Sequence, residues 1–271
     1  MPPKGRETSM THNKLLQNEF SKQAARFEEK GLTLANPEYL QWMVGHLALQ
    51  TNLKVLDVAA GTGHLSRAMA PGVERIVAVD ATLEMLRQGR RAADQAGLKN
   101  ITFARGFAEK LPFQDNAFDR VVCRFAVHHF QNPRIQMAEM VRVCRPNGRV
   151  VIIDLVSPDD PTLAESYNRL ERLRDPSHTW AQTLIGLRGL LQEAGLTVSH
   201  WESRKIEVQV NRWLELTNPD QDVRELIIEE LLGDVRGSGA TGMDPFMRDM
   251  ELLFHHTWAI VVGIKTGGTE V

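Results

Sequence analysis

Two aspartates, Asp57 and Asp80, stand at the ends of consecutive apolar runs, and a small-residue turn with Gly61 and Gly63 follows the first. Apolar runs of this length are typical of strands, and parallel strands place their carboxyl ends at one edge of a sheet. The glycines let backbone approach a ligand closely, and a carboxylate about 20 residues further on suits the hydroxyls of a ribose. The pattern therefore predicts a nucleoside-like ligand at the carboxyl edge of a parallel sheet.

Each aspartate also has a structural interpretation. Asp57 is placed to orient a cationic amine, or alternatively to hold backbone amides of the turn. Asp80 is placed to bind a ribose, or alternatively to cap a helix that begins near Thr82. A dinucleotide fingerprint would put a third glycine at position 66, where the sequence has Ser66, and no phosphate-binding lysine follows the turn. The turn therefore predicts a ligand with a ribose and without phosphates.

Two further segments follow strands of the same expected sheet. Residues 107–109 form a turn whose backbone and apolar side chain can surround an adenine. The segment 124–130 ends the fourth expected strand and contains two consecutive histidines, His128 and His129. Consecutive residues of a strand point to opposite faces, so both can face a cleft only if the strand has ended, as the following polar and proline residues indicate.

Histidine is suited to removing a proton because its pKa lies near the working pH of most enzymes. We expect one of the pair, with His129 preferred, to act as a base or to hold the substrate. The alternative is that both cap the next helix or bond the amino-terminal segment. His178, in the loop after the fifth expected strand, is a further candidate for a substrate contact. The catalytic candidates are therefore His129, His128 and His178.

The other histidines are expected to have structural roles. His64 opens a helix beside the glycine turn, and His255 and His256 alternate across the last expected strand. No spacing of His, Asp and Glu along the sequence predicts a metal site. Four aromatic residues are candidates to line a pocket, although plain core packing is the alternative: Tyr39, Trp42, Trp180 and Trp213.

Composition limits the class of protein. The 271 residues, 42% of them hydrophobic and 24% charged, are typical of a soluble globular protein. A net charge of -2 gives no electrostatic reason to expect nucleic acid or an anionic membrane as a partner. The two cysteines, Cys123 and Cys144, argue against a disulfide framework or a four-thiolate zinc site and suit the core. No run reaches the roughly 18 apolar residues of a membrane helix, so we expect a cytoplasmic protein.

Strand and helix patterns alternate along the first half of the chain. A helix is expected over 12–29, and a second begins at Pro37 after the cap Asn36. Strands that alternate with helices predict a doubly wound α/β sheet with right-handed crossovers. The expected strands are 54–59, 75–80, 101–105, 118–125 and 149–155, separated by helices over 63–72, over 82–96 and from 133 to the turn at 145–148.

The chain is expected to form one domain. Residues 1–11 are expected to be a disordered leader and 266–271 a flexible tail. The domain spans 12–265 and comprises amino-terminal lid helices (12–50), a cofactor-binding core (54–156), a substrate and lid region (157–250) and a final strand (253–265). The lid segments are expected to enclose what binds at the edge of the sheet.

The ordered set of motifs resembles the class I S-adenosylmethionine-dependent methyltransferases, most of all the ubiquinone/menaquinone-biosynthesis methyltransferase-like group that acts on small molecules. The similarity covers 20–156 well and the remainder loosely. The resemblance implies a Rossmann-like seven-stranded sheet whose last strand, at about 253–265, is antiparallel. The motifs that carry it are 55–64, Asp80, 107–109 with 111–113, 118–119 and 145–149.

The resemblance also implies roles for particular residues. S-adenosyl-L-methionine would be the cofactor and S-adenosyl-L-homocysteine the product. Thr62 and its neighbouring glycines would lie against the methionyl part, Asp80 would hold the ribose, and Phe107 with Ala108 would border the adenine. The cofactor-binding candidates are Asp57, Ala59, Gly61, Thr62, Gly63, Asp80, Ala81, Phe107, Ala108, Glu109, Arg124 and Phe125.

The expected activity is methyl transfer to an oxygen, nitrogen or carbon atom of a small-molecule acceptor. Because the sulfonium is already a good leaving group, the protein mainly supplies alignment and excludes water. Two alternatives stay open. One is a homologue that binds the cofactor but catalyses a cyclisation or rearrangement, and the other is an NAD-linked oxidoreductase. The sequence leaves the identity of the acceptor open, and it leaves both a monomer and a homodimer open.

Overall fold

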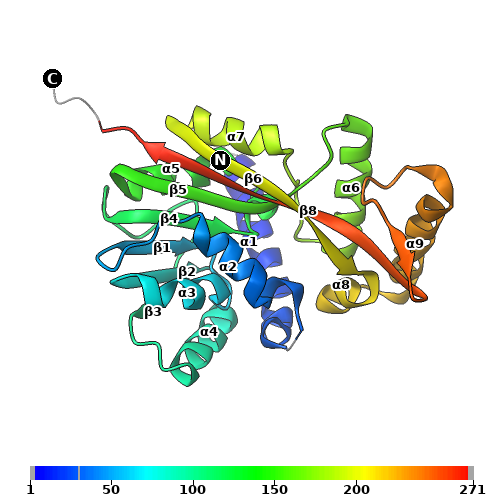
Figure 1. The fold of residues 1–271 in the computed structure, drawn as a ribbon, viewed down its shortest axis with the longest axis horizontal. Helices are drawn as coiled ribbons and strands as arrows, with labels where there is room; N and C mark the ends of the chain where they lie inside the picture. The colour runs from blue at the N-terminus through cyan, green and yellow to red at the C-terminus, as the bar shows by residue number, and fades with distance from the viewer. Residues whose placement is uncertain (1–3, 30, 268–271) are drawn as a thin grey trace.

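The computed structural model describes residues 4–29 and 31–267, and only the backbone of residues 4–10. Its centre is one twisted sheet with helices on both faces (Figure 1). The strands are β1 (Lys54–Val58), β2 (Arg75–Asp80), β3 (Ile101–Arg105), β4 (Phe118–Arg124), β5 (Cys144–Val156), β6 (Leu196–Gln209), β7 (Phe246–Arg248) and β8 (Glu251–Lys265).

The order of strands in the sheet is β3-β2-β1-β4-β5-β8-β6, and the short β7 pairs with β8 outside this path. The first five strands pair in parallel, whereas β8 runs antiparallel to both β5 and β6. The expected doubly wound sheet with an antiparallel final strand is confirmed, and β7 adds an eighth strand. Because β2 and β4 lie on opposite sides of β1, a crevice is expected beyond the carboxyl ends of β1 and β4.

The helices pack on both faces because the central strands are apolar on both. Val55 and Leu56 are consecutive in β1, yet Val55 packs with residues of α2 and α3, and Leu56 with residues of α5 and α7. Continuous apolar strands are typical of parallel sheets covered on both faces. The helices are α1 (Lys4–Gln23), α2 (Pro37–Gly45), α3 (His64–Met69), α4 (Leu83–Gln95), α5 (Pro133–Val143), α6 (Pro161–Arg174), α7 (Leu184–Glu193), α8 (Val210–Thr217) and α9 (Gln221–Gly233).

Strands β6 and β8 extend beyond the other strands, and α6, α8 and α9 gather beside the extension (Figure 1). There the rings of Trp213 in α8 and Phe254 in β8 are buried, with their centroids 4.9 Å apart. One hydrophobic cluster includes both Val55 of β1 and Ile227 of α9. The segment 157–250 therefore shares its core with the sheet.

The amino-terminal segment differs from the expectation. Helix α1 begins at Lys4, so residues 4–11 are helical and not a disordered leader, and α1 ends at Gln23 instead of residue 29. The polar composition of 4–11 suggested disorder. In the structure, residues 12 and 13 bind the edge of the sheet. A helix held at that point gains one backbone hydrogen bond with each residue added to it, so it continues through 4–11. Residues 1–3, and 268–271 of the expected tail, lie outside the described residues.

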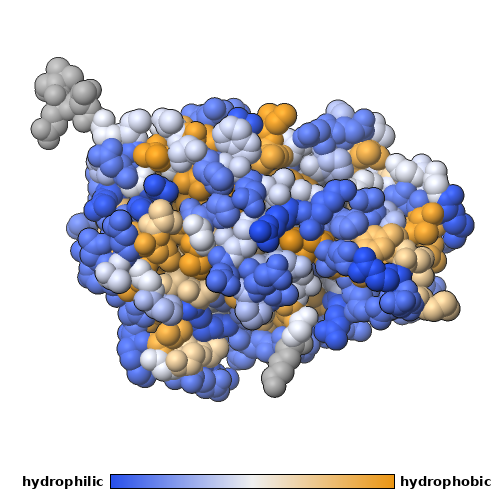
Figure 2. All heavy atoms as spheres, in the orientation of Figure 1, coloured by the Kyte–Doolittle hydropathy of each residue, from blue (hydrophilic) through white to orange (hydrophobic). Residues whose placement is uncertain are grey.

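The surface shown in Figure 2 consists mainly of hydrophilic residues, with hydrophobic ones in separate small patches. In the part of the chain that the structure describes, no helix is long and apolar enough to cross a membrane. Both Cys123 and Cys144 are buried free thiols, as their place in the core requires.

Candidate active site

A cavity of about 1340 Å3 lies at the carboxyl edge of the sheet, where the strand order reverses. It is lined by the segments that follow β1 to β4, by α1, by the loop 31–34 and by the ends of α6 and α8. Asp57 and Gly63 lie behind this lining. The cofactor-binding candidates that line the cavity are Ala59, Gly61, Thr62, Asp80, Ala81, Phe107, Ala108, Glu109, Arg124 and Phe125.

Asp80 holds the glycine turn against the end of β2. The Gly61 amide donates to Asp80 Oδ2 at 2.8 Å, and the Thr82 amide donates to Oδ1 at 2.8 Å. Gly61 and Gly63 have φ values of 57° and 74°, in the left-handed region that glycine tolerates best. A carboxylate oxygen can accept more than one hydrogen bond. The capping interpretation of Asp80 and the ribose-binding interpretation are therefore compatible.

Asp57 lies behind the turn and is 1% exposed. Its Oδ2 accepts a hydrogen bond from the Ser66 hydroxyl at 2.6 Å, and its Oδ1 has no partner among the described residues. Burial raises the pKa of Asp57 to about 6, although Ser66 and the charge of Arg124 favour the ionised form. Asp57 thus holds α3 through the hydroxyl and the backbone of Ser66.

Helix α1 covers the ends of β3 and β4. His12 Nε2 donates to the backbone oxygen of His129 at 2.8 Å, and Asn13 Nδ2 donates to Glu109 Oε1 at 2.6 Å. The ring of Phe20 meets the ring of His129 edge-on, with centroids 5.1 Å apart. One helix therefore touches both the expected adenine-binding turn and the histidine pair.

His128 and Asp154 form a buried pair near the ends of β4 and β5. His128 Nδ1 lies 2.5 Å from Asp154 Oδ1, and the His128 amide donates to Oδ2 at 3.3 Å. Burial alone would lower the pKa of His128, but the charge and the hydrogen bond of Asp154 outweigh it, and the pKa is raised. Because Asp154 occupies Nδ1, Nε2 is the nitrogen available to a ligand in the cavity that His128 lines.

His129 lines the same cavity in a different environment. Its Nδ1 donates to the backbone oxygen of Ser177 at 3.0 Å. Burial and the neighbouring His128 lower the pKa of His129 to about 4, so its ring is neutral at neutral pH. The hydrogen bond of His129 with the amino-terminal segment is made by its backbone oxygen, and its ring lies in the cavity wall against Phe20.

His178 is not where we expected it. Its Nε2 lies 2.8 Å from Asn168 Oδ1 in α6, and it is absent from the described residues that line the cavity. The Asp175 carboxylate accepts hydrogen bonds from the amide and the hydroxyl of Ser177, which turns the loop back toward α6. The ring of His178 packs behind His128, with centroids 5.4 Å apart. His178 therefore lies behind the wall of the cavity, against α6 and His128.

Another part of the cavity wall was predicted only at Trp213. The Glu171 carboxylate, fully buried, lies 2.8 Å from His256 Nε2 and 3.1 Å from Arg174 Nη2. The Arg174 guanidinium lies 4.9 Å from the centre of the Trp213 ring. Arg174, Trp213 and His256 all line the cavity. Of these residues the sequence singled out Trp213 as a pocket candidate and His256 through the strand alternation with His255, and it gave no signal for Glu171 or Arg174.

Only some of the expected aromatic residues and lid segments line the cavity. Of the four aromatic candidates, only Trp213 is among the described residues of the cavity wall, and Trp258, which was not predicted, joins it. Tyr39 packs against Trp258 with ring centroids 5.3 Å apart, and Trp42 binds Glu202 on β6 instead. Among the described residues, α2 and α7 contribute nothing to the lining, because they pack on the faces of the sheet.

The chain is similar to known methyltransferases. Residues 56–152, from β1 to β5, match the family model described as "Methyltransferase domain". The uncharacterized methyltransferase YcgJ of Bacillus subtilis (strain 168) is 34% identical over 212 residues, which cover 78% of this chain and 83% of that protein. The ubiquinone/menaquinone biosynthesis C-methyltransferase UbiE of Coxiella burnetii is 38% identical over 124 residues, 44% of this chain and 50% of that protein.

The fold is also similar to a solved structure. The crystal structure of the Bacillus subtilis YcgJ protein superimposes with a TM-score of 0.79 and 30% identity, covering 86% of this chain and 100% of that chain. The similarity therefore extends well beyond the core at 56–152.

Proposed function

The chain belongs to the class I S-adenosylmethionine-dependent methyltransferases, and we propose that it transfers a methyl group from S-adenosylmethionine to an oxygen or carbon atom of a small-molecule acceptor. The observation that carries this proposal is one cavity whose lining includes both Asp80 with its glycine turn and the His128–Asp154 pair. Membership of this family argues against the alternative of an NAD-linked oxidoreductase.

The residues around the turn fit the nucleoside part of the cofactor. Asp80 lines the cavity with acceptor capacity left on its carboxylate. The Thr62 hydroxyl is buried at the cavity and has no partner among the described residues, so it is available to a ligand. A Cβ added to Gly61 would have no heavy atom within 4 Å, which leaves space on the cavity side of the turn. When bound, S-adenosylmethionine supplies an electrophilic methyl group.

The proposed base is His128. An acceptor O–H or acidic C–H must lose its proton as the methyl group arrives, and a base with a pKa near the working pH does this best. Asp154 fixes the ring of His128, supports its positive form and leaves Nε2 for the acceptor. His129, whose pKa is about 4, is a weaker proton acceptor. The geometry therefore favours His128 over His129, the residue preferred from the sequence.

The acceptor is proposed to be a small molecule with an apolar body. Trp213, Trp258 and Phe125 contribute aromatic surface to the wall, and α1 encloses the site from the side of β3 and β4. The volume of about 1340 Å3 exceeds the usual upper range of roughly 1,000 Å3 for small-molecule pockets. A nucleoside cofactor and an acceptor can therefore occupy it together.

Two measurements test the proposal. Calorimetric titration of the folded protein is expected to show binding of S-adenosylmethionine and S-adenosylhomocysteine, and an absence of heat with both would overturn it. Incubation with labelled-methyl cofactor is then compared across matched acceptors: a phenol, its methyl ether, an acidic carbon compound and an amine. We expect label in the phenol or the carbon acid and none in the ether. Label found only in the amine would show that the transfer does not need His128 as a base. A converted substrate without S-adenosylhomocysteine would indicate the non-methylating alternative.

A further inference from the structure

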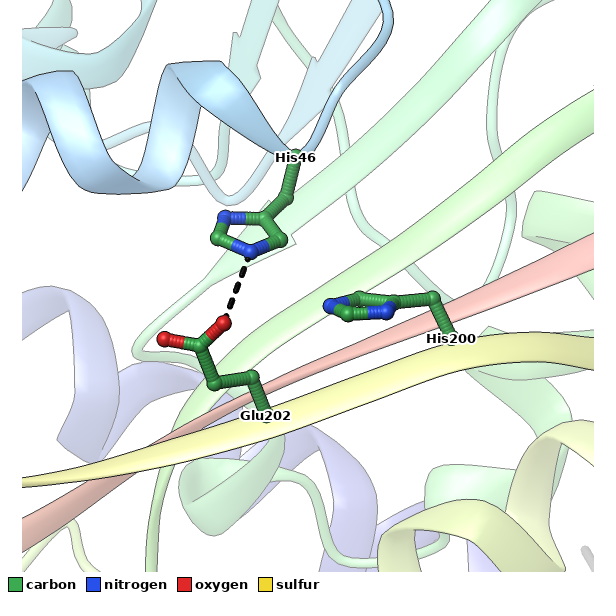
Figure 3. Close-up of side chains that lie close together, drawn as sticks. All are labelled: His46, His200 and Glu202. Atoms are coloured by element: carbon green, nitrogen blue, oxygen red, sulfur yellow. Dashed lines mark hydrogen bonds and ion pairs between the residues drawn. The ribbon is translucent and has the colours of Figure 1, made fainter.

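A second cluster of side chains lies between the end of α2 and the edge strand β6. It consists of His46, which follows α2, and of His200 and Glu202 in β6 (Figure 3). One nitrogen of each imidazole and one carboxylate oxygen all lie within 4.8 Å of one another. None of the three is among the described residues that line the cavity. The cluster is therefore separate from the candidate active site.

A bulge in β6 brings two of these residues to the face of α2. Ser199 is an extra residue relative to β8, at the point where the register between the two strands shifts. Before the bulge, Val198 packs in the core cluster of α7, and beyond it Ile206 packs in the cluster of α2. Side chains alternate along a strand and a bulge re-aims them. His200 and Glu202 therefore share the face of Ile206.

Hydrogen bonds fix the orientation of His46 and Glu202. His46 Nδ1 lies 2.8 Å from the backbone oxygen of Trp42, and because a carbonyl only accepts, Nδ1 carries the hydrogen. His46 Nε2 then faces Glu202 Oε2 at 3.0 Å, while Glu202 Oε1 accepts from Trp42 Nε1 at 2.7 Å. Two lone-pair atoms facing each other at this distance need a cation between or beside them, either a proton or a metal ion.

The set of ligand atoms has the composition of a zinc site. Two imidazoles and one carboxylate are a common protein donor set for zinc, with the remaining position open to solvent. Ligand atoms on one tetrahedral zinc ion lie roughly 3.3 Å apart, given zinc–ligand distances of about 2.0 Å. The rings of His46 and His200 are stacked with centroids 4.9 Å apart. Because His200 is exposed, a small rotation of its side chain can bring its ligand nitrogen to the spacing that one zinc ion requires.

The surroundings support this assignment. Metal-binding histidines usually donate their other N–H to a carbonyl or carboxylate, and metal-binding carboxylates are themselves hydrogen-bonded. Trp42 serves both purposes here, through its backbone oxygen and its indole N–H. Arg204, the nearby cation, lies 3.5 Å from Oε1 of Glu202, the oxygen that already binds Trp42. Glu202 Oε2 is left facing the two histidines.

We propose that His46, His200 and Glu202 bind one divalent transition-metal ion of the kind that prefers imidazole, such as zinc. The ion joins the end of α2 to β6. His46 and Glu202, which contact each other, are 156 residues apart in the sequence. Magnesium and calcium are not expected to bind, because they prefer sites built from oxygen ligands.

The full-length protein, first treated with a chelator, is titrated with zinc in competition with a chromophoric chelator. We expect one zinc ion per chain at micromolar or lower free zinc, visible d–d bands with cobalt, and no competition by magnesium. Because the ion bridges two elements of the folded chain only, a 100-fold excess over its Kd should raise the melting temperature by roughly 5 °C or more. Absence of zinc binding at micromolar concentration would overturn the proposal.

Variants separate a ligand set from a general affinity of histidines for metal. His200→Ala, at an exposed position, is expected to weaken zinc binding about 100-fold or more, and Trp42→Phe, which removes the supporting indole N–H and part of a buried ring, about 10-fold. His255→Ala is the matched control, because His255 pairs with Asp244 at 3.0 Å outside this cluster, and it should change nothing. Equal zinc affinity of His200→Ala and the unchanged protein, both with native circular dichroism, would refute the site.

Discussion

His128 Nδ1 lies 2.5 Å from Asp154 Oδ1, so the ends of β4 and β5 deliver an oriented imidazole to the wall of the cofactor cavity. Behind the pair, His178 packs against the His128 ring. The orientation of His128 is therefore fixed by Asp154 of the sheet and by the loop at 175–180. A group held in this way loses little freedom when an acceptor binds.

Replacing His128 is expected to reduce turnover far more than replacing His129. His128→Asn retains an N–H for Asp154 but removes the basic nitrogen, so kcat should fall about 100-fold or more, the usual contribution of a general base. His129→Asn should cost less than about 10-fold, since its depressed pKa makes it a poor base. The affinity for S-adenosylhomocysteine, measured by calorimetry, should change little in either variant. The reverse order of kcat values would assign the base to His129.

The pH dependence of kcat/KM should report His128. The pKa of His128 is raised above its ordinary value of 6.5, and the base works only when deprotonated. The rate is therefore expected to fall as the pH drops through a pKa above 6.5. Asp154→Asn removes the largest of the carboxylate contributions that raise this pKa, while burial still lowers it, so the acid limb should move to lower pH. An acid limb that stays in place in Asp154→Asn would contradict the pairing.

Asp80 should control cofactor affinity. Asp80→Asn replaces one acceptor oxygen by a donor that faces the Gly61 or the Thr82 amide, and it removes the charge offered to a ribose. We expect more than 10-fold weaker binding of S-adenosylhomocysteine, equivalent to about 1.4 kcal/mol. Glu84→Gln, in the first turn of the following helix α4, serves as the control and should bind normally. Unchanged affinity of folded Asp80→Asn would exclude the ribose role.

Glu171 should contribute strongly to stability. Burial alone would raise the pKa of Glu171, but Arg174 and His256 outweigh it, and the pKa lies below the ordinary value of 4.5. A carboxyl group with a depressed pKa stabilises the fold above pH 4.5, and this stabilisation is lost as the pH falls below that value. Glu171→Ala leaves Arg174 without its partner and should lower the free energy of unfolding by about 3–5 kcal/mol at pH 7.

The matched control lies on the same helix. Glu165 pairs with Arg172 at the surface, 3.1 Å away, and Glu165→Ala should cost less than about 1 kcal/mol. Urea unfolding followed by tryptophan fluorescence measures both variants. The difference between Glu171→Ala and the unchanged protein should narrow on going from pH 7 to below pH 4.5. A difference that is independent of pH would show that the carboxylate charge is not the cause.

The sheet could be predicted from the sequence because its signals are local. Strands β2 and β3 have the bounds expected for them, 75–80 and 101–105, since each is an apolar run between turn residues. The cofactor edge follows from the same signals, because the residue after each parallel strand must lie there. Helix α1 was missed at its start because its anchors, His12 and Asn13, bind loops that are far away in the sequence.

The details of the histidine site could not be predicted for the same reason. Asp154 is 26 residues from His128, and nothing in the spacing distinguishes it from any other acidic residue. The burial of His178 depends on Asn168 and on a turn at Asp175. The environment that separates the pKa values of His128 and His129 arises only when these segments pack together.

Ser199 has a consequence for how relatives of this chain are compared. Because Val198 pairs with Gly263 and His200 with Val262, Ser199 is taken up by the bulge, and a homologue of the same length that pairs without a bulge would turn its counterparts of His200 and Glu202 toward α7. Conservation of the two residue types would then be misleading. The register of β6 with β8 beyond Val198, and not only the identity of the two side chains, decides whether a homologue can present this pair to His46.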